Sequence, residues 1–259
     1  MTSIRHLSRQ GLDYTRRGAG PAVVAVHGWC LHRRMWTYLE EGLVSAGHEV
    51  LLPDLAGFGE SGDLTGPYTL QRHAADLADL LDETDLREVV LVGFAFGAGV
   101  LLHLPRFERV RGLVLIGVPS ASHAVYDRMP KAMRRDWPEF ARRSARAICG
   151  QPQSEATLGV LERMFGGTRL PVALETVEVL GAFEPTDVAH RVEVPALFVH
   201  GKADPIVPVS VSHDCAARMP QARVLEVPDS GHLVPLDAPG YLQEAVAAFV
   251  TDGMGGVAG

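Results

Sequence analysis

Short, nearly uninterrupted apolar stretches constrain the fold of this chain more than any other feature of its sequence. They lie at residues 22–26, 88–92 and 110–116, and Val and Leu dominate them. A strand buried on both faces of a parallel sheet has this composition. Segments with apolar residues at helical spacing, such as residues 70–81, lie between such stretches. This alternation predicts an α/β fold with a mostly parallel central sheet flanked by helices.

Weaker patterns complete the expected order of elements. Further strands are expected at residues 49–52, 196–200 and 224–227, further helices at residues 35–45, 96–104 and 239–250, and a hairpin at residues 5–17. Pro105 is expected to stop the helix that begins at residue 96, because proline cannot continue the helical hydrogen-bond ladder.

The segment between Ser120 and Arg191 breaks the alternation. It has no pattern typical of a buried strand and is helical in composition. An insertion at the end of a sheet strand is where a lid would lie. We therefore predict an α/β core formed by residues 1–119 and 192–251, with a helical cap or lid at residues 120–191. The Gly-rich residues 252–259 are expected to form a disordered tail.

Composition narrows the class of protein. The 259 residues carry 24 Lys and Arg against 31 Asp and Glu, a net charge of -7, which argues against a nucleic-acid partner. No apolar run approaches the roughly 20 residues that span a bilayer, and the N-terminus lacks the apolar core of a secretory signal. We therefore expect no membrane partner and a cytoplasmic location. The three cysteines lie far apart, and no histidines have the spacing of metal ligands. We therefore expect no metal and no other cofactor.

Chemistry is expected beyond the carboxyl ends of the strands, where open parallel sheets bind their ligands. His27-Gly28-Trp29 follows the first buried strand, and the Trp29 amide there suits one half of an oxyanion hole. Gly93-Phe94-Ala95-Phe96-Gly97 follows another strand and opens a helix. This frame predicts a nucleophile elbow with Ala95 at its centre and the Phe96 amide facing the oxyanion.

Two further loops carry the residue types of an acid and a base. Asp204 lies four residues after the strand that is expected to end at residue 200. His232 follows the last expected strand, in the loop Asp229-Ser230-Gly231-His232. A carboxylate that orients a histidine, which in turn acts as general base, is the pattern of a catalytic triad.

Taken together, these stretches resemble the α/β-hydrolase superfamily of the esterase and acyltransferase type. The matching stretches are HGW at 27–29, DLAGFGES at 54–61, GFAFG at 93–97, HGKAD at 200–204 and SGH at 230–232, which follow one another in the family's order. The resemblance implies that Asp204 is the triad acid and His232 the base, with Trp29 and Phe96 as the oxyanion donors. It places the nucleophile at Ala95, which has no nucleophilic atom.

Three interpretations of Ala95 remain open at this stage. The alanine replaces a serine in an engineered inactive variant, or it is native and His232 with Asp204 does acid–base chemistry without a covalent step, or the protein only binds a ligand. An elbow residue is held in a strained backbone conformation, which a chain without a nucleophile would relax most simply with glycine. Alanine keeps the strain and removes the chemistry, which favours the first interpretation.

Other nucleophiles are conceivable. Cys30 lies near the predicted oxyanion loop, but a buried free cysteine is usually inert. Ser61 and Ser120 also follow strands, where a hydroxyl more often stabilises a turn or a loop.

The expected activity is acyl transfer. With a serine at position 95, the site would act on an ester or thioester of a small acyl group, as an esterase, thioesterase or acyltransferase. The partner would be a small-molecule acyl substrate, free or linked to a carrier protein or coenzyme A. Seven basic residues between positions 128 and 146, against Asp136 and Glu139, could attract such a carrier or could simply be a solvated helix face. The alternative is a lyase or cyclase that uses His232, or a member of the family that only binds.

Overall fold

An eight-stranded sheet forms the centre of the computed structural model, which describes residues 4–121 and 125–253. The strands are β1 (Ile4–Leu7), β2 (Asp13–Arg17), β3 (Ala22–Val26), β4 (Glu49–Pro53), β5 (Val89–Phe94), β6 (Val110–Ile116), β7 (Ala196–Gly201) and β8 (Ala222–Val227), in the order β1-β2-β4-β3-β5-β6-β7-β8. Only β2 runs antiparallel to its neighbours, and every other pair is parallel. The predicted mostly parallel sheet is confirmed.

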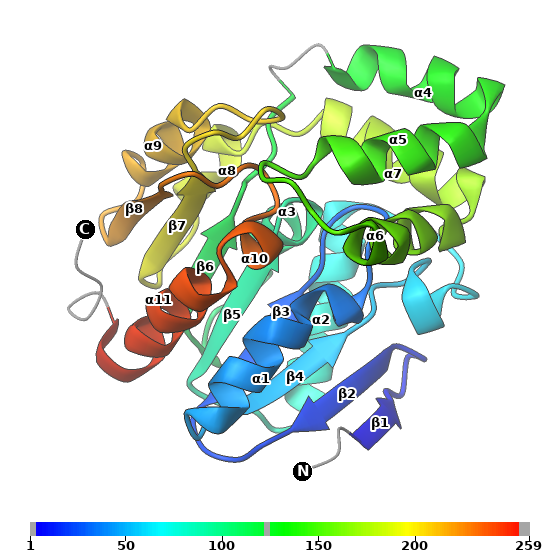
Figure 1. Ribbon diagram of the computed structural model, residues 1–259. Coiled ribbons are helices and arrows are strands. Elements are labelled where there is room, and N and C mark those ends of the chain that lie inside the picture. The colour runs from blue at the N-terminus through cyan, green and yellow to red at the C-terminus, as the bar shows by residue number, and fades with distance from the viewer. Residues whose placement is uncertain (1–3, 122–124, 254–259) are drawn as a thin grey trace.

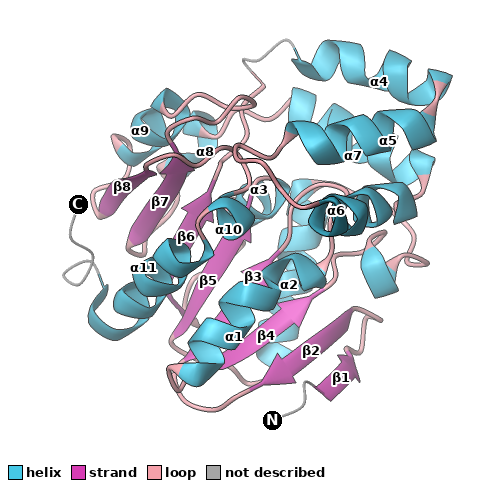
Figure 2. Ribbon diagram, viewed as in Figure 1, coloured by secondary structure: helices cyan, strands magenta, loops and turns pink. Residues whose placement is uncertain are grey.

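Helices cover both faces of the sheet (Figures 1 and 2). The helices of the core are η1 (Arg33–Trp36), α1 (Thr37–Ser45), η2 (Gly59–Ser61), α2 (Leu70–Glu83), α3 (Phe96–Leu101), α9 (Ser210–Ala216), α10 (Val234–Asp237) and α11 (Pro239–Asp252). Helices α1 and α11 pack together on one face, and α2 and α3 pack together on the other. The predicted flanking of the sheet by helices is therefore also confirmed.

Local sequence explains most element boundaries. Every residue of β3 is buried, as its continuous apolar run predicts. Helix α2 begins after Thr69, whose hydroxyl accepts a hydrogen bond from the Arg72 amide at 3.2 Å. Helix α3 ends at Leu101, three residues before the end predicted from Pro105. The residue before a proline disfavours the helical conformation, so the chain leaves the helix before it reaches the proline.

A helical insertion joins β6 to β7 and lies beyond the carboxyl ends of the strands (Figure 1). It contains α4 (Val125–Arg135), α5 (Trp137–Ala147), α6 (Glu155–Gly167), α7 (Leu170–Gly181) and α8 (Thr186–Ala189). Asp136 and Ser154 accept hydrogen bonds from amides in the first turns of α5 and α6, which fixes where these helices begin. At the other end of the chain, Asp252 is still the last residue of α11. Of the expected tail, residues 254–259 lie outside the described residues.

None of the described helices is long and apolar enough to cross a membrane.

Candidate active site

A tight turn between β5 and α3 holds Ala95. Its backbone lies at φ 46° and ψ -108°, a conformation that side-chain-bearing residues rarely adopt. A Cβ atom on Gly93 would lie 2.8 Å from the Ala98 Cα, and one on Gly97 would lie 2.4 Å from the Val26 carbonyl oxygen. The turn therefore requires glycine at both flanking positions. This is the elbow geometry that the sequence predicts, with a methyl group at its centre.

Asp204 and His232 form a hydrogen-bonded pair at the ends of two other strands. His232 Nδ1 lies 2.7 Å from Asp204 Oδ2. The amides of Ile206 and Val207 donate to Asp204 Oδ1 at 2.7 and 2.9 Å, and His200 Nε2 lies 3.3 Å from Oδ2. The carboxylate is therefore fixed on both oxygens, and it fixes the orientation of the imidazole in turn.

The electrostatics of the pair favour an ionised Asp204. Burial alone would raise the pKa of this carboxyl, whose side chain is only 1% exposed. The hydrogen bonds from His200, His232 and the Val207 amide outweigh burial and hold the pKa well below its usual range. A carboxylate that stays ionised can stabilise a positive charge on His232.

Two neighbours define the position of the His232 ring. The ring lies 5.1 Å from the Phe94 ring, measured between centroids. On another side lies Gly117, which follows β6 and has a φ of +57°. A Cβ atom there would lie 3.1 Å from His232 Cε1 and 3.2 Å from Nδ1. Glycine at position 117 thus satisfies both the left-handed backbone and the close approach of the imidazole.

The two predicted oxyanion donors come from the loop after β3, which holds Trp29, and from the elbow itself, which holds Phe96. Neither the Trp29 amide nor the Phe96 amide donates a hydrogen bond within the described part of the chain. The Trp29 indole is held by Thr176 Oγ1 at 3.0 Å and by the Ala173 carbonyl at 3.3 Å, both on α7. The loop after β3 is thereby tied to the helical insertion.

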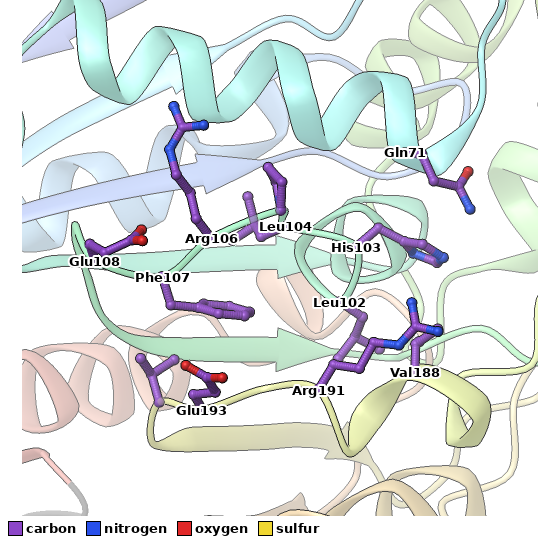
Figure 3. A pocket seen from close by; sticks show the side chains of 12 residues that line it. Gln71, Leu102, His103, Leu104, Arg106, Phe107, Glu108, Val188, Arg191 and Glu193 are labelled. Atoms are coloured by element: carbon purple, nitrogen blue, oxygen red, sulfur yellow. The ribbon is translucent and has the colours of Figure 1, made fainter.

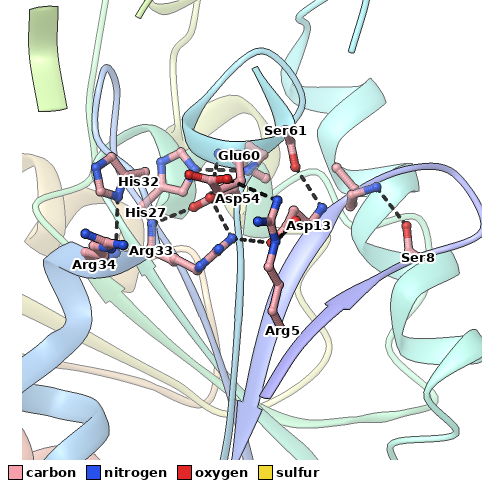
Figure 4. Close-up of polar contacts among 12 residues, drawn as sticks. Arg5, Ser8, Asp13, His27, His32, Arg33, Arg34, Asp54, Glu60 and Ser61 are labelled. Atoms are coloured by element: carbon pink, nitrogen blue, oxygen red, sulfur yellow. Dashed lines mark hydrogen bonds and ion pairs between the residues drawn. The ribbon is translucent and has the colours of Figure 1, made fainter. Parts of the chain in front are cut away.

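His27 and Asp54 hold the loops beneath the site together (Figure 4). His27 Nε2 accepts a hydrogen bond from the Leu55 amide at 3.0 Å, so Nδ1 donates to the Gly28 carbonyl at 2.9 Å. Burial lowers the pKa of His27 to about 4, which keeps the ring neutral. Asp54 accepts from the Arg33 amide and guanidinium, both at 2.7 Å. Both side chains therefore have structural partners.

A cavity of about 250 Å³ lies where the elbow meets the helical insertion. The predicted site residues Trp29, Ala95, Phe96 and His232 all line it, and from the insertion come Tyr126, Met129, Phe140, Ser144 and Phe165. Asp204 is not among the lining residues and lies behind His232, to which it is hydrogen bonded. The structure thus brings together all five residues singled out from the sequence.

A larger surface cleft of about 880 Å³ lies elsewhere, near the end of α3 (Figure 3). His103, Phe107 and Arg191 line it, and none of the predicted site residues does.

The other nucleophiles that the sequence offers are unsuited to that role. Cys30 is completely buried, and burial raises the pKa of its thiol well above the usual range. The Ser61 hydroxyl accepts a hydrogen bond from the Asp13 amide at 2.8 Å, and the Ser120 hydroxyl donates to Glu184 Oε2 at 2.8 Å. None of the three lines the cavity.

Sequence reasoning missed several residues that shape the site. Gly117 follows a predicted strand, so its position at a carboxyl end was a usable signal. Tyr126 and Ser144 line the cavity from α4 and α5, and no sequence pattern separates them from surface residues of those helices. Within the described residues, no group of three or more His, Cys, Asp or Glu side chains is arranged to hold a metal ion.

Comparison with known proteins places this geometry in a family. The profile of the alpha/beta hydrolase family matches residues 23–245. A putative non-heme chloroperoxidase from Synechocystis is 30% identical over 80% of this chain and 82% of its own length. A pimeloyl-[acyl-carrier protein] methyl ester esterase from Xanthomonas campestris is 29% identical over 90% of this chain and 96% of its own length.

Solved structures agree on the fold. An esterase from Exiguobacterium antarcticum superimposes with a TM-score of 0.89 at 20% identity, covering 97% of this chain and all of the other. A bromoperoxidase from Bacillus anthracis gives 0.88 at 22% identity, with the same coverage of both chains. The chain belongs to the alpha/beta hydrolase family.

Proposed function

We propose that this chain carries the acyl-binding site of a serine ester hydrolase in which Ala95 occupies the place of the nucleophile. The observation that supports this most strongly is the 2.7 Å hydrogen bond between His232 and Asp204, beside an elbow that keeps its strained backbone. The relative from Xanthomonas campestris, named as a methyl ester esterase, agrees with an ester substrate.

The proposed roles follow from the chemistry of acyl transfer. With serine at position 95, Oγ attacks the acyl carbon while His232 Nε2 takes the hydroxyl proton. Asp204 holds the imidazole in the tautomer that can accept this proton and stabilises the resulting charge. The Trp29 and Phe96 amides stabilise the oxyanion. His232 then protonates the leaving group, and water, or another acceptor, releases the acyl group from the serine.

The chain as it stands can bind an ester but has no oxygen at position 95 with which to form an acyl-enzyme. Alanine differs from serine only by that one oxygen, and this chain has both the elbow backbone and the bonded pair of Asp204 and His232. We therefore expect this chain to hold an acyl ester without covalent turnover.

The decisive experiment restores the hydroxyl. The Ala95→Ser chain is mixed with a fluorophosphonate probe and examined by intact-protein mass spectrometry, with the unchanged chain as control. A stoichiometric adduct on the Ala95→Ser chain alone is expected, because the base and the oxyanion donors would act on the new serine at once. Absence of an adduct on a folded Ala95→Ser chain contradicts the proposal.

The surface of the helical insertion supports a carrier-linked substrate. Of its basic residues, Arg134, Arg142, Arg143 and Arg146 form ion pairs with glutamates. Arg128, Lys131 and Arg135 have no ion pair within the described residues. They line a groove of about 590 Å³ together with Arg143 and the acidic residues Asp127, Asp136 and Glu139. Phe140 lines both this groove and the cavity. An acidic carrier protein would meet the three cations without an ion pair beside the cavity.

Reversing the charge of these three cations tests whether the substrate is linked to an acidic carrier protein. In the Ala95→Ser chain, changing Arg128, Lys131 and Arg135 together to Glu is expected to raise KM for an acyl-carrier-protein ester by about tenfold or more. The value for a free p-nitrophenyl ester should stay the same, because that substrate lacks the acidic carrier. An equal change for both substrates would show that the effect lies in the cavity and not in a carrier surface.

A second candidate function follows from the oriented imidazole of His232. Asp204 orients His232 in a chain that has no nucleophile, and an oriented imidazole can remove a proton from a bound substrate or from water without a covalent step. In that case the unchanged chain has an activity of its own, of the lyase or cyclase type, and His232→Ala abolishes it. A chain that only binds would show neither this activity nor its loss.

A further inference from the structure

We propose that Asp237 is a positioning residue whose carboxylate fastens the turn between α5 and α6 to the loop that carries His232. The helical insertion and the base would then move as one body. This inference rests on the role proposed above for His232.

Asp237, the last residue of α10, accepts hydrogen bonds from both segments. Its Oδ2 accepts from the Gly231 amide at 2.9 Å and from the Gly150 amide at 3.1 Å. Its Oδ1 accepts from Gln153 Nε2 at 3.1 Å and from the Gln151 amide at 3.4 Å. Three donors come from the turn of the insertion and one from the residue directly before His232, so a single side chain links the two segments.

The backbones of the insertion's turn and of the His232 loop also lie in close contact. A Cβ atom on Gly150 would lie 2.2 Å from the Gly231 Cα, and one on Gly231 would lie 2.3 Å from the Gly150 Cα. On the other side of His232, the Leu233 amide donates to the Ile148 carbonyl at 3.2 Å. The residues before and after His232 therefore both contact the helical insertion.

The opposite side of the same loop is held by the strand that leads to Asp204. The Ala203 amide donates to the Ser230 carbonyl at 2.9 Å, and a Cβ atom on Gly201 would lie 2.1 Å from the Gly231 carbonyl oxygen. The loop of His232 thus lies between the acid's loop and the turn of the insertion. Release of the turn would remove one of these two supports and change the distance between His232 and Asp204.

A carboxylate suits this position better than its amide. Both oxygens of Asp237 face N–H donors, so the amino group of an asparagine would be directed at other donors. The negative charge of Asp237 also acts on Cys149, whose thiol pKa is raised to about 11 by burial and then by this carboxylate.

Nuclear magnetic resonance of the unchanged chain, labelled with ¹⁵N at histidine, tests the proposal without any activity. The reporter is the downfield Nδ1 proton of His232 in its hydrogen bond to Asp204. We expect Asp237→Asn to shift or broaden this signal, because the loop loses its support. Glu244→Gln, an exposed neutralisation on α11, is the matched control and should leave the signal in place. An unchanged signal in a folded Asp237→Asn chain overturns the proposal.

Gly150→Ala acts from the insertion side and leaves Asp237 itself unaltered. It is expected to perturb the same His232 signal, and in the Ala95→Ser background both variants should slow fluorophosphonate labelling by about tenfold or more. If Gly150→Ala lowers only the unfolding temperature and leaves the signal and the labelling rate unchanged, the coupling does not exist. If the Ala95→Ser parent is not labelled at all, the proposed function fails, while the His232 signal still decides the role of Asp237.

Discussion

His73 is fully buried in α2, and neither of its ring nitrogens has a hydrogen-bond partner within the described part of the chain. It packs against Phe96 and Phe58, with ring centroids 5.4 and 6.4 Å away. Burial lowers its pKa from 6.5 to about 3. The unfolded chain therefore binds one more proton than the folded chain between these two pH values, and the free energy of unfolding falls as the pH drops through this window.

The substitution His73→Leu should make this acid sensitivity smaller. From about pH 7 to about pH 4.5, the variant should lose about 2–3 kcal/mol less of its free energy of unfolding than the parent. Urea denaturation at both pH values measures the difference. His190→Leu, at an exposed histidine, is the control and should not alter the pH dependence. Equal losses in parent and His73→Leu would show that His73 is not the group responsible.

Gly117 lies directly against the imidazole of His232, the proposed base. An alanine there would add a left-handed backbone strain of about 1 kcal/mol and push a methyl group against His232. In the Ala95→Ser chain, Gly117→Ala should slow fluorophosphonate labelling by about tenfold or more. Gly47→Ala is a matched control, because Gly47 also has a positive φ, +85°, but nothing lies within 4 Å of its added Cβ. If both variants label equally slowly, general destabilisation and not the contact with His232 is the cause.

At the scale of elements, the junction of β5 and α3 stores strain at Ala95 that a glycine would release. The strain destabilises the folded chain by about 1–3 kcal/mol. Glycine would remove it, but its greater conformational freedom in the unfolded chain would offset about 0.5–1 kcal/mol of the stabilisation. Ala95→Gly should therefore raise the free energy of unfolding by about 1 kcal/mol. Ala95→Ser should change it little, because serine keeps the same backbone conformation. Chemical denaturation of the three chains side by side measures both, and a Gly chain less stable than the parent would refute the strain argument.

At the scale of the whole molecule, the core and the helical insertion together bound the cavity that we propose for the acyl group. The cavity between them, about 250 Å³, is smaller than the roughly 300–1,000 Å³ of pockets for drug-sized ligands. In the Ala95→Ser chain we expect the p-nitrophenyl butyrate ester to react at least about tenfold faster than the laurate ester.

Truncation of one wall should relax this limit. Phe140→Ala on α5 enlarges the cavity and should narrow the preference for butyrate over laurate. Val160→Ala, at a partly exposed residue of α6 that does not line the cavity, should leave the ratio of kcat/KM values unchanged. A laurate ester that reacts as fast as butyrate in the parent would show that the acyl chain lies outside this cavity.

Strands and loops with a clear local pattern could be predicted from the sequence, and short helices without one could not. Strand β6 was predicted at its observed bounds, because a strand buried on both faces leaves a continuous apolar run in the sequence. Helices α9 and α10 were not anticipated, since they are short and their apolar residues show no clear period. The structure brings Trp29, Ala95, Phe96, Asp204 and His232 together because each follows a recognisable strand, and parallel strands bring their carboxyl ends to one edge. Their roles stay a prediction.

The sequence by itself determined the α/β fold, and it predicted the positions of a nucleophile, an acid and a base, because these depend on local apolar patterns and on the order of loops along the chain. It also determined that the side chain at position 95 carries no oxygen. Only the tertiary structure decided the 2.7 Å contact between His232 and Asp204, the space that Gly117 leaves for the imidazole, and the linkage of the insertion to the base through Asp237. Apart from the local bond between Gly231 and Asp237, these contacts join residues 28 to 115 positions apart. No local pattern encodes such pairs, because they form only when the packing of the whole sheet brings distant loops together.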